Sequence, residues 1–292
     1  MSAAMEPDFS TIGIIGPGRM GSALADALHY TGHAIHAIAG RSSESHRAIA
    51  LAQRLGATVM TAQQLAKQCS LIILATPDDK LAHIANVLDW SAHSAVIHLS
   101  GATDISILQP AADQGAYIGS FHPLQSISQP IGSASTFQHC TISIEAAAPA
   151  LKARLEQLAH SLGAHINLLP ANARMRYHAS ANHASALLIG LLMDMAQLWE
   201  SWGSNEKEMM TALLPLMEGT LSSAKTNGIA QALTGPLARG DINTLTGHLS
   251  ALYALDPALA QRYALRHIAL LHLAPESQRS TLEALLIEYA QR

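Results

Sequence analysis

The first half of the chain alternates short apolar runs with amphipathic stretches of helix-forming residues. The apolar runs are only three to six residues long and are apolar on both faces, which is typical of buried β-strands. They cover residues 11–15, 34–39, 71–75, 95–99, 117–119 and 140–144. The stretches at 23–30, 43–55, 80–88 and 147–162 predict helices. Because strands that are apolar on both faces must be covered on both sides, this order predicts an α/β fold with a parallel sheet.

The pattern changes near Pro170. From residue 173 onward, long runs of Ala, Leu, Met, Gln and Glu are interrupted by Gly, Pro and Asn, and no run reads convincingly as a strand. These runs predict about five or six helices. We therefore expect two domains, an α/β domain over residues 1–169 and an all-α domain over residues 170–292.

A glycine-rich turn follows the first predicted strand. Gly16, Gly18 and Gly21 fit the pattern G-x-G-x-x-G and stand where the strand gives way to a helix. In a Rossmann domain the first glycine allows the tight turn, the second lets a pyrophosphate approach the backbone, and the third lets helix and strand pack closely. The free N–H groups at the helix start then bind the phosphates. The alternative is a glycine-rich turn without a ligand. The predicted pyrophosphate site comprises Gly16, Pro17, Gly18, Arg19, Met20 and Gly21.

The end of the second strand indicates which dinucleotide binds. NAD-specific sites usually have Asp or Glu there, about 20 residues beyond the glycines, to bind the ribose 2′-hydroxyl. This strand instead ends in Gly40, Arg41, Ser42 and Ser43. A guanidinium and two hydroxyls suit a 2′-phosphate, so NADP is the expected cofactor, although Arg41 as a solvated loop cation is the alternative.

Two further turns follow later strands of the same sheet, and in a Rossmann domain both approach the nicotinamide half of the cofactor. We expect the first to lie beside the nicotinamide ribose and the second to approach the ring. The residues of these turns are Ala75, Thr76 and Pro77, and Ser100 and Gly101. Both can also be ordinary turns, because Pro and Gly commonly interrupt a chain.

Two more segments strengthen the assignment. Residues 121–126 read F-H-P-L-Q-S and residues 234–241 read T-G-P-L-A-R-G-D. With the glycine turn and Gly40-Arg41-Ser42, they resemble Rossmann-like proteins that carry a C-terminal DUF2520 domain. The wider relatives are ketopantoate reductase, pyrroline-5-carboxylate reductase and the 6-phosphogluconate dehydrogenase group. The resemblance spans most of the chain. It implies NADP-linked reduction, a 6-phosphogluconate dehydrogenase-like helical domain, and a homodimer built through that domain.

The resemblance also implies a small 2-oxo acid such as ketopantoate as substrate. The chain departs from ketopantoate reductases at the first helix of the second domain, where their general-acid Lys cannot be placed. Residues 174–183 offer His and Asn instead, which leaves the substrate open. The alternatives are an imino acid reductase of the pyrroline-5-carboxylate type and a non-catalytic NADP-binding regulatory protein.

Histidine is the side chain best suited to supply a proton near neutral pH. His122 follows a strand at the sheet edge, and His178, Asn182 and Ser185 are spaced to share one helical face. We expect His122, His178 and Asn182 to be catalytic. Ser185, Arg239 and Asp241 are the expected substrate-binding residues. Each assignment has a structural alternative. His122 could hold its loop in place by a hydrogen bond, and the helical face with His178 could pack at a dimer interface. Asp241 could cap the helix that begins near residue 242.

Composition excludes several classes of protein. The net charge of −4 argues against nucleic-acid binding. The most apolar stretch, 184–199, contains Asp194 and is shorter than the ~20 residues of a membrane span. Cys69 and Cys140 form no C-x-x-C motif, and residues 1–10 lack a basic region, so we expect a reducing, cytoplasmic location. The histidines lack the spacing and further ligands of a zinc site, so no metal is expected.

Overall fold

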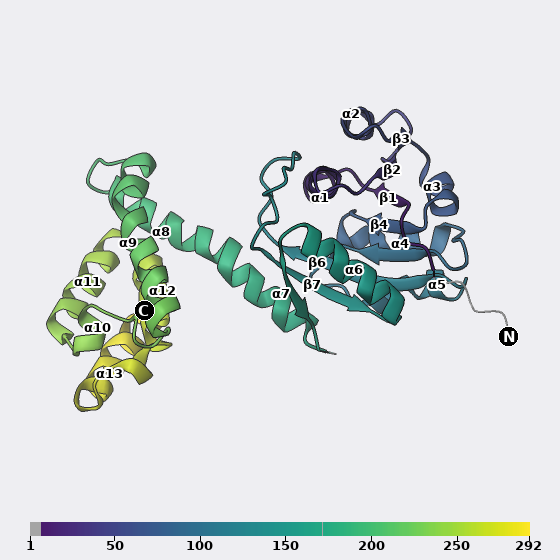
Figure 1. The fold of residues 1–292 in the computed structure, drawn as a ribbon. Coiled ribbons are helices and arrows are strands. Elements are labelled where there is room, and N and C mark those ends of the chain that lie inside the picture. Colours follow the sequence, from purple (N-terminus) through teal and green to yellow (C-terminus); the bar gives the residue numbers. More distant parts are fainter. Residues whose placement is uncertain (1–6, 171) are drawn as a thin grey trace. The chain divides into compact units, whose positions relative to one another are not determined.

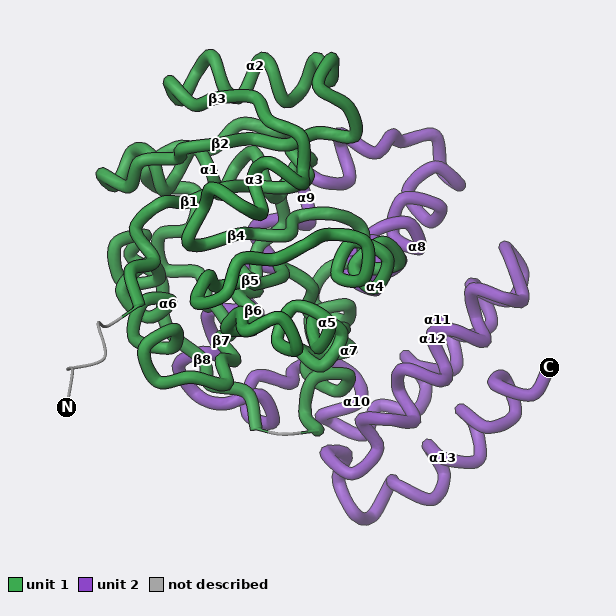
Figure 2. The backbone as a smooth tube through the Cα atoms, turned by 90° about the vertical axis from the view of Figure 1, so that its right-hand side faces the viewer, with its two compact units in different colours: residues 1–185 green, residues 186–292 purple. Residues whose placement is uncertain are grey.

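The computed structural model describes residues 7–170 and 172–292, so most of the N-terminal segment 1–10 lies outside the described residues. The chain divides into two compact units, residues 1–185 and residues 186–292, shown in green and purple in Figure 2. Each unit contains its own hydrophobic core. The domain boundary near residue 170 stays a prediction, because the two compact units do not show which segments of the chain fold independently.

The described strands of unit 1 form one sheet with the strand order β3-β2-β1-β4-β5-β6-β7-β8. Neighbouring strands are parallel except β6 and β7, which are antiparallel. The strands are β1 (Ile12–Ile15), β2 (Ile35–Ala39), β3 (Thr58–Val59), β4 (Leu71–Leu74), β5 (Ala95–His98), β6 (Tyr117–Leu124), β7 (Thr141–Ala146) and β8 (His165–Leu168). The predicted α/β fold with a mostly parallel sheet is confirmed.

Helices cover both faces of this sheet, as its doubly apolar strands require. One face packs against α1 (Arg19–Tyr30), α2 (His46–Leu55) and α6 (Pro149–Ser161), and α6 lies across β6 and β7 in Figure 1. The other face packs against α3 (Ala62–Gln68), α4 (Asp78–Val87) and α5 (Gln109–Ala112), with the 3-10 turn Ile105–Leu108 beside it. The carboxyl ends of the parallel strands therefore open between two helical layers, where ligands bind in such folds.

The remaining helices begin at Arg174. Helix α7 (Arg174–Asn182) belongs to unit 1 and continues through a π-helical segment, His183–Leu187, into α8 (Leu188–Glu200). Unit 2 adds α9 (Glu206–Asn227), α10 (Pro236–Arg239), α11 (Ile242–Leu255), α12 (Pro257–Ile268), the 3-10 turn Leu271–Leu273 and α13 (Glu276–Gln291). The expected helical second part is confirmed, and its core joins α10, α11, α12 and α13. Among the described residues, no helix has the length and apolarity to cross a membrane.

Candidate functional site

The glycine turn joins β1 to α1 at the carboxyl edge of the sheet. Gly16 has φ +98°, and a Cβ on Gly21 would lie 2.5 Å from the Gly16 carbonyl oxygen, so backbone geometry explains both glycines. Gly18 is different, because a Cβ there would meet no atom within 4 Å. It is also the N-cap of α1 and provides no side-chain acceptor for the first-turn N–H groups. Open space at Gly18 beside uncapped N–H groups fits a phosphate ligand.

A pocket of about 880 Å³ lies over this turn. The ends of β1 and β2 and the turn between β4 and α4 contribute to its walls. The expected cofactor residues that line it are Gly16, Pro17, Gly18, Arg41, Ser42, Ala75, Thr76 and Pro77. The other expected residues do not line it. Arg19, Met20 and Gly21 form the first turn of α1, Ser43 follows Ser42, and Ser100 and Gly101 follow β5.

The charged side chains that line this pocket are all basic. Arg41, Arg47 and Lys80 contribute, and no Asp or Glu is among the described residues that line it. Lys80 pairs with Asp79, whereas Arg41 and Arg47 form no ion pair with the described residues. Sequence reasoning missed Arg47 and Lys80. Arg47 could have been found, since it stands in the first turn of the helix that follows Arg41.

A second group of side chains gathers at the end of the neighbouring strand β5. His122 from β6 and His178 from α7 converge on Gly101. A Cβ on Gly101 would lie 2.7 Å from both His122 Nε2 and His178 Nδ1, and the two imidazole rings are 6.2 Å apart between centroids. The structure thus brings together two of the three expected catalytic residues. Glycine at position 101 keeps the space between them free of a side chain.

Burial controls the charge of His122. Desolvation, with further contributions from His178 and Arg174, lowers its pKa to about 4, and Asp78 acts in the opposite direction. His122 is therefore neutral at pH 7 and can donate or accept a hydrogen bond without carrying a charge. Its Nδ1 lies 2.8 Å from the hydroxyl of Tyr177, a residue that sequence reasoning missed. Because Tyr177 and His122 are 55 residues apart, no local pattern indicates this pair.

Arg174 fixes α7 to the sheet. Its buried guanidinium donates to the Ser100 carbonyl (3.2 Å) and the Ser120 hydroxyl (2.7 Å), and it forms an ion pair with Glu145. The Ser100 hydroxyl is also occupied, because it donates to Asp78 (2.7 Å) and accepts the Thr103 N–H (2.9 Å). Ser100 therefore holds its own loop together, and the open side of this loop is at Gly101.

The other expected residues of the first unit lie on the helix that leads to α8. Asn182 is exposed at the end of α7, and Ser185 lies in the π-helical segment. Ser185 donates its hydroxyl proton to the Ala181 carbonyl at 2.8 Å. The wider π turn alters the spacing from which a shared face with His178 was expected. Neither side chain hydrogen-bonds to His122 or His178 in the described structure.

Arg239 and Asp241 belong to unit 2. Asp241 is the N-cap of α11, where it accepts from the Thr244 N–H at 3.0 Å and the Thr244 hydroxyl at 2.7 Å. The capping alternative for Asp241 is therefore confirmed, and Gly240 before it takes the left-handed conformation with φ +69°. Arg239 is the last residue of α10. Their roles toward a substrate stay predictions.

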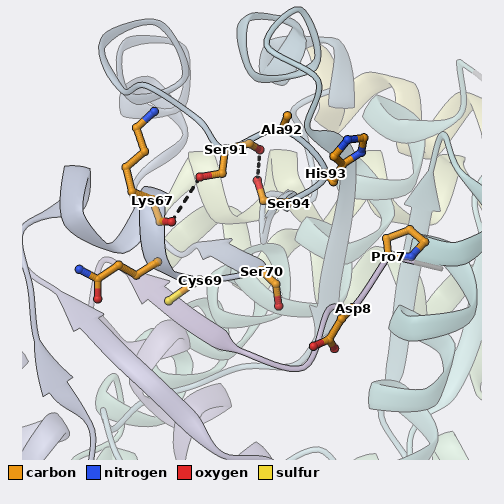
Figure 3. A pocket seen from close by; sticks show the side chains of 10 residues that line it. Pro7, Asp8, Lys67, Cys69, Ser70, Ser91, Ala92, His93 and Ser94 are labelled. Carbon is orange, nitrogen blue, oxygen red and sulfur yellow. Dashed lines mark hydrogen bonds between the residues drawn. The ribbon is translucent and has the colours of Figure 1, made fainter. Parts of the chain in front are cut away.

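A different pocket of about 570 Å³ lies at the amino ends of β1, β4 and β5 (Figure 3). Its lining includes Cys69, Ser70 and His93. Burial raises the pKa of Cys69 to about 11, so this thiol stays protonated and is a poor nucleophile. Ligands of open parallel sheets bind at the opposite edge. Among the described residues, no group of three or more His, Cys, Asp or Glu side chains is arranged to hold a metal ion.

Comparisons with known proteins agree with this geometry. Residues 1–123 match the family described as Rossmann-like domain, and residues 140–268 match DUF2520, a domain of unknown function. The family resemblance expected from the sequence is confirmed. No curated protein matches the chain.

Solved structures share the fold over almost the whole chain. A Bacteroides fragilis protein, proposed to be an NADP oxidoreductase, is 22% identical with a TM-score of 0.72, covering 89% of this chain and 97% of that one. A reductive aminase from Aspergillus terreus, in complex with NADPH and ethyl-5-oxohexanoate, is 14% identical with a TM-score of 0.68 and coverages of 97% and 94%. The 1-pyrroline-5-carboxylate reductase of Streptococcus pyogenes is 18% identical with a TM-score of 0.62 and coverages of 97% and 98%.

Proposed function

We propose that this chain, which joins a Rossmann-like domain to a DUF2520 domain, is an NADPH-dependent reductase of a small carbonyl or imine compound. The observation that carries this proposal is the pocket over the glycine turn, which combines open space at Gly18 with a wholly basic set of charged side chains. The similar structures that contain NADPH or NADP support the same cofactor.

The expected cofactor residues, in the pocket and beside it, divide between the two ends of NADP. The first-turn N–H groups of α1 would receive the pyrophosphate. Arg41, Ser42 and Ser43 would bind the 2′-phosphate, with Arg47 as a second cation. The turn Ala75-Thr76-Pro77 would lie beside the nicotinamide ribose, and Gly101 would leave room for the ring. When bound, the cofactor supplies the hydride.

The two histidines at Gly101 would act on the substrate in different ways. His122 is neutral at pH 7, so we assign it a hydrogen bond that orients the reacting oxygen or nitrogen. We assign the proton donation to His178, whose Nδ1 is buried at the same place without a hydrogen-bond partner among the described residues. Asn182, Ser185, Arg239 and Asp241 remain proposed contacts of the substrate or its carboxylate.

Two substrate classes fit this chemistry. A small 2-oxo acid such as ketopantoate offers a carbonyl to the hydride, and a cyclic imino acid offers a C=N bond. The similarity to pyrroline-5-carboxylate reductases and reductive aminases favours the imine. The two classes differ in the charge of the bound species, and neutral His122 is compatible with either.

Binding and turnover test the proposal in sequence. Calorimetry at neutral pH should detect NADPH binding that is much tighter than NADH binding. NADPH oxidation should then be screened over 2-oxo acids, including ketopantoate, and over cyclic imino acids, including pyrroline-5-carboxylate. With the active substrate, His178→Gln should lower kcat, whereas NADPH affinity should not change. Binding without turnover would support the non-catalytic regulatory protein, and absence of NADPH binding would overturn both.

We also propose that the chain works as a homodimer. Helix α9 has 22 residues, all described, and buries only Met209, while α8 buries only Asp194. Large apolar side chains are exposed along both helices instead: Leu188, Ile189, Leu191, Met193, Leu214, Leu216 and Leu221. A monomeric protein rarely exposes so much apolar surface. A second copy of the same two helices would cover it with matching chemistry.

A further inference from the structure

A row of polar side chains crosses strands β6, β7 and β8 at the position of His122. In the sheet register, His122 of β6 faces Ser143 of β7, and Ser143 faces Asn167 of β8. Ser143 is 1% exposed, and its chain neighbours Ile142 and Ile144 are buried in the core. Because polar groups buried in a hydrophobic core are shielded from water, they need hydrogen-bond partners within the protein. The hydroxyl of Tyr177, from α7, completes the row.

One end of this row is an amide donor, which fixes the direction of the first hydrogen bond. The Asn167 amide Nδ2 can only donate, and it donates to the Ser143 hydroxyl oxygen at 2.9 Å. The Ser143 hydroxyl therefore keeps its own proton to donate. Burial raises the pKa of Tyr177 overall, and the nearby Ser143 hydroxyl acts in the opposite direction.

Tyr177 in turn has one proton to give, and His122 Nδ1 lies 2.8 Å from its oxygen. A neutral imidazole that accepts at Nδ1 must carry its own proton on Nε2. We propose that Ser143 donates to the Tyr177 oxygen and that Tyr177 donates to His122 Nδ1, so that Tyr177 is a positioning residue that fixes His122 as the Nε2–H tautomer.

The tautomer decides what His122 offers at the proposed site. Nε2 is one of the two ring nitrogens that converge at Gly101, 2.7 Å from the position of a Cβ on that residue. With the proton on Nε2, His122 donates a hydrogen bond into this space, and a carbonyl oxygen or imine nitrogen can accept it. With the proton on Nδ1, Nε2 would present a lone pair and repel the same atom. This consequence rests on the proposed function, whereas the tautomer does not.

The tautomer can be measured directly, without cofactor or substrate. We would record long-range ¹H–¹⁵N spectra of the full chain with ¹⁵N-labelled histidine at pH 7, and assign His122 by the loss of its signals in His122→Gln. The expected spectrum has a protonated Nε2 and an unprotonated Nδ1. In Tyr177→Phe, which removes the donor and keeps the ring, the ratio of the Nε2–H to the Nδ1–H form should fall about five- to tenfold.

Two further variants separate this effect from general damage to the fold. Ser143→Ala should shift the His122 tautomer in the same direction as Tyr177→Phe, because Tyr177 then loses the bond that directs its proton. Tyr263→Phe is the matched control, since it removes a similar Tyr–His bond in unit 2, between the Tyr263 hydroxyl and His248 Nδ1 at 2.9 Å. It should leave the His122 signals unchanged.

The proposal is overturned if wild-type His122 carries its proton on Nδ1, or if both Tyr177→Phe and Ser143→Ala keep the wild-type tautomer. If instead the proposed function is wrong, the experiments give a different result. In that case NADPH does not bind, while the spectra still report the Nε2–H form. Should the substrate screen succeed, Tyr177→Phe should raise KM more than it lowers kcat, because it disturbs a bond that orients the bound substrate.

Discussion

Arg41 and Arg47 of the basic pocket form no ion pair with any residue that the structure describes, and Arg41 stands closer in the chain to the end of β2. If Arg41 binds the 2′-phosphate, Arg41→Ala removes a charge-assisted bond that is worth about 1.5–3 kcal/mol. We expect the Kd for NADPH to rise at least about tenfold and the Kd for NADH to stay unchanged, as measured by calorimetry. Lys152→Ala, which removes an exposed cation from α6, should alter neither value. Equal losses for both nucleotides would place Arg41 elsewhere on the cofactor.

His98 makes the stability of the fold depend on pH. This residue of β5 is fully buried. Desolvation, together with the charge of Arg174, lowers its pKa to about 4, and Asp78 and Asp104 act in the opposite direction. The unfolded chain has an ordinary histidine pKa near ~6.5. As the pH falls through that value, the unfolded state binds the proton first, so stability is lost between about pH 6.5 and 4.

The loss attributable to His98 is about 3 kcal/mol, from the difference between the two pKa values. His98→Asn should remove this part of the pH dependence, because the amide oxygen can accept the Ser100 N–H that His98 Nδ1 accepts now. Urea denaturation at pH 7 and pH 4.5 measures the difference. His160→Asn, at an exposed position on α6, is the control. Identical pH profiles for the wild type and His98→Asn would contradict the assignment.

At the scale of elements, α7 depends on one buried cation. Arg174 connects this helix to the end of β5, to Ser120 of β6 and to Glu145 of β7. Arg174→Met leaves the Glu145 carboxylate without its partner, and because Glu145 is only half-buried we expect a cost of about 3 kcal/mol, the lower end for such pairs. Chemical denaturation gives the value. Arg176→Met, an exposed arginine on the same helix, should cost less than about 0.5 kcal/mol. Equal effects of the two substitutions would refute a structural role for Arg174.

The sequence predicted those strands and helices that have a clear pattern of apolar residues within their own segment. The fully buried strands β1, β4 and β5 are continuous apolar runs and were found within about a residue or two. Strand β8 was missed, because its residues are half-exposed and its pairing with β7 supplies the information. Helix α3 could have been found, since Thr61 and Gln64 form a capping box that is visible as T-x-x-Q. The antiparallel direction of β7 depends on the loop that precedes it and has no such local signal.

The same distinction between local patterns and long-range contacts applies to the residues of the candidate site. The glycine turn and Arg41 are local patterns, and both line the pocket. His122 and His178 were chosen for their chemistry, and the fold brings them together at Gly101. Tyr177, Ser143 and Arg174 could not be chosen in this way. Their partners are tens of residues away in the chain, so no local sequence pattern marks these residues. Only the folded sheet shows which side chains they contact.

At the scale of the whole molecule, the two units differ in how completely they bury their apolar residues. Unit 1 encloses both faces of its sheet, and the core of unit 2 joins α10 to α13. Helices α8 and α9 lie largely outside that core, although Arg262 and Arg266 of α12 both bind Asp194 of α8, at 2.8 and 2.6 Å. These ion pairs anchor one side of α8 and leave its apolar side chains exposed. Self-association is therefore the expected behaviour in solution.

Leu221→Glu tests this association. Leu221 of α9 is 68% exposed, so a charge there costs the monomer little, but a dimer that covers α9 would have to bury an unpaired carboxylate. We expect sedimentation at micromolar concentration to give a dimer for the wild type and a monomer for the variant, with NADPH binding to unit 1 retained. Tyr30→Glu, at a 60% exposed position on α1, should remain dimeric. A monomeric wild type would exclude the dimer, and a dimeric Leu221→Glu variant would mean that the two copies meet through another surface.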